Sequence, residues 1–282
     1  MAPTRRRIRA RIEVAAAYRV LMDSCWATFA SRLADCARAE TLSRWRSGCA
    51  VENKAGPGSF DPVTDADREA ERAMRALIEQ EQPDHGILGE ELGEKASRGD
   101  LCWVLDPVDG TRSFTCGLPT WVTLIALLDR GAPTFGLIDA PCLDERYYGS
   151  PDQSWLEERG RTTRLATSRC TAVGEARLSS TDPGLFSGAG AQAFARLTAQ
   201  TRTVRYGHDG YAYARLAAGT LDLVVETGLQ RHDYCALIPV VRGAGGAFGD
   251  WRGGEDFSSG RVIAAATPEL YRAAVAVMRD AA

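Results

Sequence analysis

Histidine is scarce in this 282-residue sequence, which contains only His85, His208 and His232. Their surroundings suggest no Ser-His-Asp or Cys-His order, so a triad-type hydrolase is not indicated. His85 is expected either at the surface or in the core with its hydrogen bonds satisfied. The eight cysteines never fall in a C-x-x-C spacing, which argues against a zinc site and against a thioredoxin-type redox pair. We therefore expect the cysteines to be buried thiols.

Net positive charge and long apolar runs are also missing. The formal net charge is −3 and the isoelectric point is near 5.8, so no global basic field attracts nucleic acid, which is an unlikely partner. No apolar run is long enough to span a membrane, and no secretory leader is recognisable. We expect no membrane association and a location in the reducing cytoplasm.

One short segment departs from this acidic balance. The stretch RRRIRAR, Arg5–Arg11, places five arginines in seven positions. It is typical of a nucleic-acid or membrane-surface arm, of a transit peptide, or of the solvated start of an amphipathic helix. We favour the solvated helix, because no apolar signal core follows and Glu13 soon restores acidity.

The composition that remains is that of a globular protein with a large core. Hydrophobic residues make up 45% of the chain and charged residues 25%, which suits one large domain or two closely joined ones. Looser composition at residues 149–163 predicts a boundary there. We expect an α+β half at residues 1–150 and an α/β half at residues 151–282, within a layered α/β or α+β protein.

Periodicity predicts the main elements. A helix with Thr64 as its N-cap carries an apolar face that includes Ala70, Met74 and Ile78. Strands are predicted at residues 101–105, 121–128, 134–138 and 221–226, and helices near 191–200 and 211–218. A further helix should begin at Asp233, bend at Pro239 and end at residues 245–246. The last helix has Thr267 as N-cap and Pro268 at its first position.

The segment WVLDPVDGTRSF, residues 103–114, holds the clearest chemical signal. Pro107 lacks an N–H and Gly110 accepts a positive φ, so the strand must break into a turn. Asp106 and Asp109 can then converge, and the carbonyl of Val108 is free to act as a third oxygen ligand. Because no paired histidine or cysteine lies nearby, Mg²⁺ or Mn²⁺ is favoured over zinc.

Other acidic residues strengthen this interpretation. Glu90 and Glu91 follow a short apolar pair, and Asp67 and Asp233 accompany predicted helix starts. If Glu90, Asp106, Asp109 and Asp233 gathered in one place, their repulsion would raise at least one pKa unless a cation lay among them.

Each of these carboxylates also has a structural explanation. The alternatives are a capping-box partner of Thr64 for Asp67, a helix N-cap for Asp233, a solvated turn for residues 90–91, and Asx-type turns for Asp106 and Asp109. The co-occurrence of several carboxylates at strand ends and helix starts favours a metal site.

Together these motifs resemble a known family. VTDAD, GEE, WVLDPVDGTRSF and a later Asp before ALIPVVRGAGG are similar to the ordered signature set of the inositol monophosphatase family of Mg²⁺-dependent, lithium-sensitive phosphatases. The resemblance runs from about Lys54 to Ala266. It implies an αβαβα layered sandwich, like that of inositol monophosphatase and fructose-1,6-bisphosphatase, and usually a homodimer. Residues 1–150 would carry most metal ligands, and residues 151–282 would complete the substrate site.

The resemblance also implies roles for individual residues. Thr111 and Asp67, with Glu90, would orient the attacking water for direct in-line hydrolysis of a phosphomonoester without a phosphoenzyme. The amides of Gly110 and Thr111 would hold phosphate oxygens, and Glu226 would contact the alcohol part of the substrate. Two or three Mg²⁺ ions are implied, with Mn²⁺ as a substitute and Li⁺ as an inhibitor. The implied metal ligands are Glu90, Asp106, the Val108 carbonyl, Asp109 and Asp233.

Details of the sequence resemble the histidinol-phosphatase branch. HDYCALIPVV at residues 232–241, GLPTW at 117–121 and ARLSSTDPGLF at 176–186 differ from the pattern of the inositol-specific members. Histidinol phosphate carries an ammonium and an imidazole, so carboxylates such as Asp209 and Glu226 would suit it. Asp209 is equally explained as a turn residue between His208 and Gly210.

The expected function is therefore hydrolysis of L-histidinol phosphate to L-histidinol and phosphate. An inositol-1-monophosphatase or a related sugar or nucleotide phosphatase is the alternative. A hypothesis of another class is an RNA-polymerase- or RNA-associated binding protein of the same fold, which the segment Arg5–Arg11 motivates.

Overall fold

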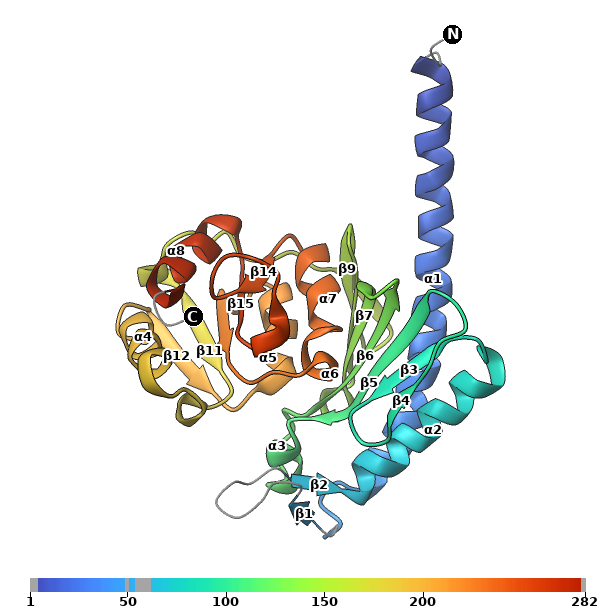
Figure 1. Ribbon diagram of the computed structural model, residues 1–282, viewed down its shortest axis with the longest axis horizontal. Helices are drawn as coiled ribbons and strands as arrows, with labels where there is room; N and C mark the ends of the chain where they lie inside the picture. Colours follow the sequence, from blue (N-terminus) through green and yellow to red (C-terminus); the bar gives the residue numbers. More distant parts are fainter. Residues whose placement is uncertain (1–4, 49–50, 54–61, 280–282) are drawn as a thin grey trace.

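The protein forms five layers in the order helix, sheet, helix, sheet, helix (Figure 1). The computed structural model describes residues 5–48, 51–53 and 62–279, with side chains from residue 25 onwards except Pro62. The helices are α1 Arg5–Arg44, α2 Asp65–Glu81, α3 Thr111–Thr115, α4 Gly188–Thr198, α5 Asp209–Ala217, α6 Arg231–Tyr234, α7 Leu237–Gly243 and α8 Pro268–Met278. Short 3₁₀ turns are η1 Pro141–Leu143, η2 Val173–Glu175, η3 Pro183–Leu185 and η4 Phe257–Ser259.

The larger sheet has eight strands in the order β10-β9-β8-β7-β6-β5-β3-β4. Only the β3–β5 pair is parallel. The strands are β3 Gly86–Gly89, β4 Gly93–Lys95, β5 Leu101–Asp109, β6 Val122–Asp129, β7 Ala132–Ala140, β8 Glu145–Ser150, β9 Gln153–Glu158 and β10 Arg161–Arg164. The sheet thus continues past residue 150, and residues 153–164, where we expected a boundary, form its last two strands.

The smaller sheet has five strands in the order β12-β11-β13-β15-β14. These strands are β11 Arg177–Ser180, β12 Thr203–Tyr206, β13 Leu223–Glu226, β14 Ala247–Asp250 and β15 Val262–Ala265. The change from one sheet to the other therefore lies between Arg164 and Arg177. A separate pair, β1 Val51–Asn53 and β2 Pro62–Thr64, lies beside the start of α2.

Three apolar clusters join the layers. The first places α1 and α2 against the outer face of the large sheet, through Phe29, Met74 and Trp103 among others. The second fills the space between the sheets with α5 and α7. The third packs α4 and α8 on the outer face of the small sheet. Because each sheet is covered on both faces, its central strands are apolar runs rather than alternating patterns.

Most predicted elements are confirmed. The strands at 101–105, 121–128, 134–138 and 221–226 correspond to β5, β6, β7 and β13, and the helices near 191–200 and 211–218 to α4 and α5. Thr64 caps α2, and the Thr267 hydroxyl accepts from the Leu270 amide at the start of α8.

Two predictions about chain breaks are wrong in detail. Strand β5 does not end at Pro107 but continues through a bulge to Asp109. The predicted single helix from Asp233 is two helices, α6 and α7, separated at residues 235–236. Pro239 explains this separation, because it cannot donate to the carbonyl four residues earlier, that of Cys235, and its ring crowds that carbonyl.

The expectation of buried cysteines is only partly correct. Cys235 is buried, whereas Cys25 and Cys116 are exposed, and the others in the described ranges are half-buried. Cys49 lies outside the described residues. His85 is half-buried and accepts a hydrogen bond from the Trp103 indole at 3.1 Å, so it lies between the two expected settings, with one ring nitrogen satisfied.

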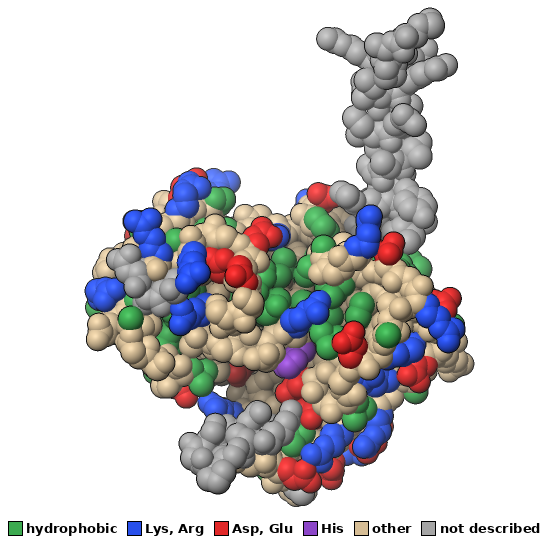
Figure 2. Space-filling view, viewed as in Figure 1, with side chains coloured by type: hydrophobic (Ala, Val, Ile, Leu, Met, Phe, Trp, Pro, Cys, Tyr) green, Lys and Arg blue, Asp and Glu red, His purple; other side chains and the backbone are tan. Residues whose placement is uncertain are grey.

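Surface charge and hydropathy agree with the composition. Figure 2 shows cationic and anionic side chains interspersed over the displayed face rather than gathered by sign. Among the described residues, no helix combines the length and the apolar character that crossing a membrane requires. The side chains of Arg5–Arg11 lie outside the described part of the chain, so the role of that segment stays a prediction.

Candidate active site

The bulge in β5 brings the two aspartates of DPVDGT to one side of the sheet. Asp106 pairs with Leu124 and Asp109 with Val122, so Pro107 and Val108 lie opposite a single residue of β6. That arrangement is a β-bulge, one of the few places where a proline fits inside a sheet.

The turn that follows is held by short-range hydrogen bonds. The Val108 amide donates to the Asp106 carboxylate at 3.1 Å, and the Thr111 hydroxyl donates to the Val108 carbonyl at 3.0 Å. Gly110 has φ of +87° and directly precedes α3. Glycine is suited to this left-handed conformation.

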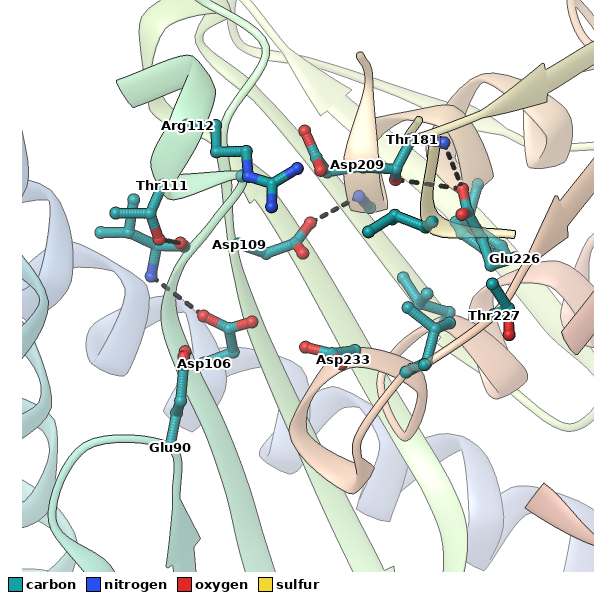
Figure 3. A pocket seen from close by; sticks show the side chains of 18 residues that line it. Glu90, Asp106, Asp109, Thr111, Arg112, Thr181, Asp209, Glu226, Thr227 and Asp233 are labelled. Carbon is teal, nitrogen blue, oxygen red and sulfur yellow. Dashed lines mark hydrogen bonds between the residues drawn. The ribbon is translucent and has the colours of Figure 1, made fainter. Parts of the chain in front are cut away.

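Carboxylates from three separate segments converge beside this turn. Oxygen atoms of Asp106, Asp109 and Asp233 all lie within 4.8 Å of one another. Glu90, on the loop after β3, lies beside Asp106 in Figure 3. The cavity they share has a volume of about 280 Å³. Its wall is formed by Glu90, Asp106, Val108, Asp109, Gly110, Thr111, Arg112, Thr181, Leu185, Asp209, Gly210, Tyr213, Glu226, Thr227, Gly228, Leu229, Asp233 and Leu237.

Burial and mutual repulsion disfavour ionisation of this cluster. Burial, reinforced by the charges of Glu90, Asp109 and Asp233, raises the pKa of Asp106 well above its usual range. The pKa of Asp109 is raised in the same way, by burial and by Asp209 and Asp233, and burial raises the pKa of Asp233 to about 6. A divalent cation among these oxygens would offset the repulsion. The donor set therefore fits Mg²⁺ or Mn²⁺.

Asp67 combines the capping role with an unused oxygen. Its Oδ2 accepts from the Thr64 amide at 2.9 Å and from the Thr64 hydroxyl at 2.5 Å, which completes a capping box. Its Oδ1 is buried without a hydrogen-bond partner among the described residues. Burial raises the pKa of Asp67 to about 7. A buried carboxylate oxygen without a hydrogen-bond partner, such as Asp67 Oδ1, is rare in proteins and suggests a bound water or cation beside it. Asp67 is not among the residues that line the cavity.

Asp233 belongs to the first turn of α6 but is not its N-cap. Gln230 occupies the cap position, and its amide donates to Asp233 Oδ2 at 2.5 Å. The other carboxylate oxygen lies 3.4 Å from Nε2 of His232. The structural alternative, in which Asp233 is only a helix N-cap, is therefore wrong, and the helix begins two residues before the predicted start. Asp233 lies in the carboxylate cluster, and its role as a ligand stays a prediction.

Asp209 begins helix α5 and is part of the cavity wall, so the alternative that it is only a turn residue is wrong. It adopts φ of +45° as the first residue of α5. The next amide, of Gly210, donates to Asp109 Oδ2 at 2.5 Å. A Cβ on Gly110 would lie 3.0 Å from the Asp209 carboxylate, so this close approach depends on glycine. Burial raises the pKa of Asp209, which Thr181, Arg112 and Ser113 partly counteract.

Glu226 ends β13 and is 1% exposed. It accepts from the Thr181 amide at 2.7 Å, from the Thr181 hydroxyl at 3.1 Å and from the Ser180 hydroxyl at 3.4 Å. Burial raises its pKa to about 8. The carboxyl group is thus held in place at the cavity wall opposite Asp106 (Figure 3).

Sequence reasoning missed several residues of the cavity. Arg112 is the only cationic side chain among the described residues that line it, and it lies 3.6 Å from Asp182. Thr181 anchors Glu226, and the buried hydroxyl of Tyr213 has no partner among the described residues. Arg112 follows DGT directly and could have been noticed. Thr181 lies inside the segment ARLSSTDPGLF, which drew attention for its likeness to one branch of the family and not for a contact with Glu226. Tyr213 lies far from the motifs in sequence and carries no local signal.

A layered αβαβα fold with a buried carboxylate cluster at a strand bulge is characteristic of metal-dependent phosphomonoesterases. The family model described as the inositol monophosphatase family matches residues 22–281. The chain therefore belongs to the inositol monophosphatase family, whose members are Mg²⁺-dependent phosphatases, and the predicted family and fold are confirmed.

Individual relatives agree with this assignment. The chain is 46% identical over 201 residues to the bifunctional phosphatase IMPL2, chloroplastic, of Arabidopsis thaliana, covering 69% of this chain and 56% of that protein. It thus spans little more than half the length of that relative. It is 34% identical over 217 residues to a histidinol-phosphatase of Mycobacterium tuberculosis, covering 74% and 82%. A solved inositol monophosphatase from Zymomonas mobilis superposes with a TM-score of 0.78 at 38% identity, covering 89% and 96%.

Proposed function

We propose that the protein hydrolyses a phosphomonoester whose alcohol is cationic, with L-histidinol phosphate as the preferred substrate. The observation that carries the proposal is the cavity itself, in which Asp106, Asp109 and Asp233 converge at one side and Asp209 and Glu226 line the other. The similarity to a histidinol-phosphatase supports the choice of substrate.

The acidic cluster supplies the cation site. In this proposal Glu90, Asp106, the Val108 carbonyl, Asp109 and Asp233 hold two or three Mg²⁺ ions, for which Mn²⁺ can substitute and with which Li⁺ interferes. The bound ions would supply Lewis-acid activation of water and stabilisation of the leaving oxygen. The raised pKa values of Asp106 and Asp109 support this role, because cation binding would relieve the repulsion that raises them.

Residues beside the cluster orient the water and the phosphate. Asp67 has one carboxylate oxygen fixed by Thr64 and the other unpartnered, so it can accept a proton or a hydrogen bond from water. Thr111 donates its hydroxyl to the Val108 carbonyl, and both residues line the cavity. The Gly110 and Thr111 amides at the start of α3 would donate to phosphate oxygens. Attack would be direct and in line.

The alcohol would lie against Asp209 and Glu226. Burial raises the pKa of both carboxyl groups, so an ammonium or imidazolium beside them would stabilise their charged forms and be stabilised in turn. Neutral inositol would gain hydrogen bonds but not this ionic contribution. This difference in charge is the physical basis for preferring histidinol phosphate.

An inositol phosphate is the second candidate. The 38% identity to the Zymomonas mobilis inositol monophosphatase favours it. The side chains on Asp209 and Glu226 can also accept hydrogen bonds from hydroxyl groups. The two candidates differ in whether the alcohol is charged, which kinetics can separate.

The first prediction is therefore about substrate choice. With Mg²⁺ present, kcat/KM should be about tenfold or more higher for L-histidinol phosphate than for inositol 1-phosphate, because each 1.4 kcal/mol of ionic stabilisation gives about a factor of ten. Fructose 1,6-bisphosphate and adenosine 3',5'-bisphosphate complete the panel of substrates.

The variant Asp106→Asn tests the metal site. It should abolish turnover of every substrate, while its circular dichroism spectrum stays that of the wild type. A preference for inositol 1-phosphate would assign the protein to the second candidate, and an active Asp106→Asn would contradict the metal site.

We also propose a homodimer and a cytoplasmic location. The relative IMPL2 is named as chloroplastic, and imaging of the tagged protein in its own cell would distinguish the two compartments. Sedimentation of the purified chain would measure the oligomeric state.

A further inference from the structure

A buried glutamate on α2 takes no part in the scheme above. Glu71 is completely buried, and its carboxylate reaches the loop after β3 that carries Glu90. We propose that Glu71 is a positioning residue that fixes this loop and so sets the affinity of the site for divalent cations. The inference rests on the proposed function, in which Glu90 is a metal ligand.

The contacts of Glu71 are with backbone amides next to Glu90. Its Oε2 accepts from the Glu91 amide at 2.7 Å, and its Oε1 accepts from the Leu92 amide at 3.1 Å. On the other side, the amide of Glu90 itself donates to the Leu105 carbonyl of β5 at 3.2 Å. The backbone at and just after Glu90 is thus held by β5 and by Glu71. A ligand on a fixed backbone loses less freedom when it binds a cation.

The approach of Glu71 to this loop depends on a glycine. A Cβ added to Gly89 would lie only 1.9 Å from Oε1 of Glu71 and 2.3 Å from its Cδ. The carboxylate therefore fills the space that any other side chain at position 89 would take. Gly89 has no positive φ that would itself exclude alanine.

The carboxylate of Glu71 is paired with an arginine and not with the proposed cations. Arg75, one turn later on α2, donates its Nε to Oε1 at 2.7 Å. A carboxylate offers acceptors to both amides and to the guanidinium, whereas a glutamine offers one acceptor oxygen and turns an NH₂ group toward a donor. The ionised side chain is therefore the one that satisfies all three donors.

Helix α2 thereby carries two groups for the site on one face. Asp67 lies four residues before Glu71, which places both on the same side of the helix. Both are fully buried. The helix would set the water-orienting oxygen and the loop of Glu90 relative to each other, so a small displacement of α2 would affect both.

The second prediction tests this role with two variants that act by different means. Glu71→Gln keeps the size of the side chain but removes one acceptor, and Gly89→Ala keeps the charge but displaces the carboxylate. Both should weaken Mn²⁺ binding about 10- to 100-fold, as loss of an outer hydrogen bond to a metal ligand typically does. Calorimetric titration of the full chain with MnCl₂ measures the affinity. At saturating metal, KM for the substrate should be unchanged.

Asp222→Asn provides the matched control. Asp222 is also a buried carboxylate that accepts from an arginine and a backbone amide, both of Arg177, but it lies just before β13 and is not among the residues that line the cavity. This variant should lose stability without losing Mn²⁺ affinity. If Glu71→Gln and Gly89→Ala behave like Asp222→Asn, unfolding more easily but binding Mn²⁺ as the wild type does, Glu71 is only structural and the inference is wrong.

Asp106→Asn separates this inference from the proposed function. Loss of Mn²⁺ binding in Asp106→Asn together with unchanged binding in Glu71→Gln would overturn the role of Glu71 alone. Unchanged binding in Asp106→Asn would overturn the metal site and with it the premise of the inference.

Discussion

At the scale of single residues, the site is made of carboxyl groups whose burial is offset in different ways. Asp67 is tied to Thr64, Glu226 to Thr181, and Asp106 and Asp109 mainly face other acids. Burying an ionised carboxylate is unfavourable unless it is paired or binds a cation. The groups without cationic partners are therefore those that gain most from a ligand.

The third prediction concerns the pH dependence of stability through Glu226. Its folded-state pKa of about 8 lies above its ordinary value of 4.5, so the folded protein favours the protonated form. Protonated Glu226 therefore contributes stability that is fully present below about pH 4.5. This contribution to the free energy of unfolding is lost as the pH rises toward 8, by up to about 1.4 kcal/mol for each pH unit. Glu226→Gln cannot ionise and should lack this loss.

Urea unfolding in EDTA at pH 5 and pH 8 measures this effect. The difference in free energy of unfolding, Glu226→Gln minus wild type, should be larger at pH 8 than at pH 5. Exposed Glu175→Gln is the control and should run parallel to the wild type. Parallel curves for Glu226→Gln as well would mean that Glu226 ionises as readily in the folded protein as in the unfolded chain.

Sequence was sufficient for some of these residues and not for others. Asp106 and Asp109 are recognisable because they sit together in one short motif around a proline and a glycine. Glu71 accepts from an amide 20 positions away, and the Thr181 amide donates to the carboxylate of Glu226, 45 positions away. Nothing in the local sequence indicates these long-range contacts. The ligand roles assigned from the motif stay predictions until metal binding is measured.

At the scale of elements, close backbone contacts place the helices between the sheets. Helix α7 approaches β7 and β8 at two glycines: a Cβ on Gly136 would lie 2.1 Å from the Ala236 carbonyl, and one on Gly149 would lie 2.3 Å from Cα of Val240. Helix α6, which carries Asp233, directly precedes α7. The position of the last proposed ligand thus depends on how α7 lies on the large sheet.

The fourth prediction is that Gly149→Ala destabilises the protein. The added methyl group collides with the backbone of α7, and overpacking of this kind typically costs about 1–3 kcal/mol. Urea unfolding of the metal-free protein measures the loss. Gly174→Ala is the matched control, because its Cβ would meet only the Gln200 carbonyl at 3.7 Å. Equal stability of the two variants would show that α7 can move away from the sheet at no cost.

The elements that sequence predicted best are those with continuous apolar character. Strands β5, β6 and β7 are buried on both faces, so they appear in the sequence as uninterrupted hydrophobic runs. Strands β9 and β10 were missed because QSWLEE and RTTR are largely polar, and all four residues of β10 are exposed. The division of α6 from α7 follows from Pro239, which the sequence shows but which we expected to bend a single helix at its own position.

At the scale of the whole molecule, the proposed site is assembled from distant parts of the chain. Its acidic residues come from the loop after β3, from β5, from the start of α5, from the end of β13 and from α6. The layered αβαβα arrangement was implied by the family resemblance and not by composition, and the order of strands in the two sheets was not predicted. A cation bound there would connect Asp106 and Asp109 of the large sheet with Asp233 of α6, the helix that follows β13 of the small sheet.

The fifth prediction follows from this assembly. Mg²⁺ should raise the melting temperature, because it binds the folded site and not the dispersed ligands of the unfolded chain. At 100 times Kd the gain is about 2.7 kcal/mol, or roughly 5 °C for a chain of this size. The rise should be larger at pH 8 than at pH 6, because ligands must lose protons to bind. Differential scanning calorimetry measures it. An equal rise in Asp106→Asn would assign the stabilisation to another site.

The bulge in β5 determines to which face of the sheet the two aspartate side chains of the motif point. In a regular strand, residues three apart point to opposite faces of the sheet. Asp106 and Asp109 share a face because one additional residue is accommodated between them. The spacing of the two aspartates is therefore as informative as their identity. Two acids three positions apart lie on the same face of a sheet only where a bulge interrupts the pleat.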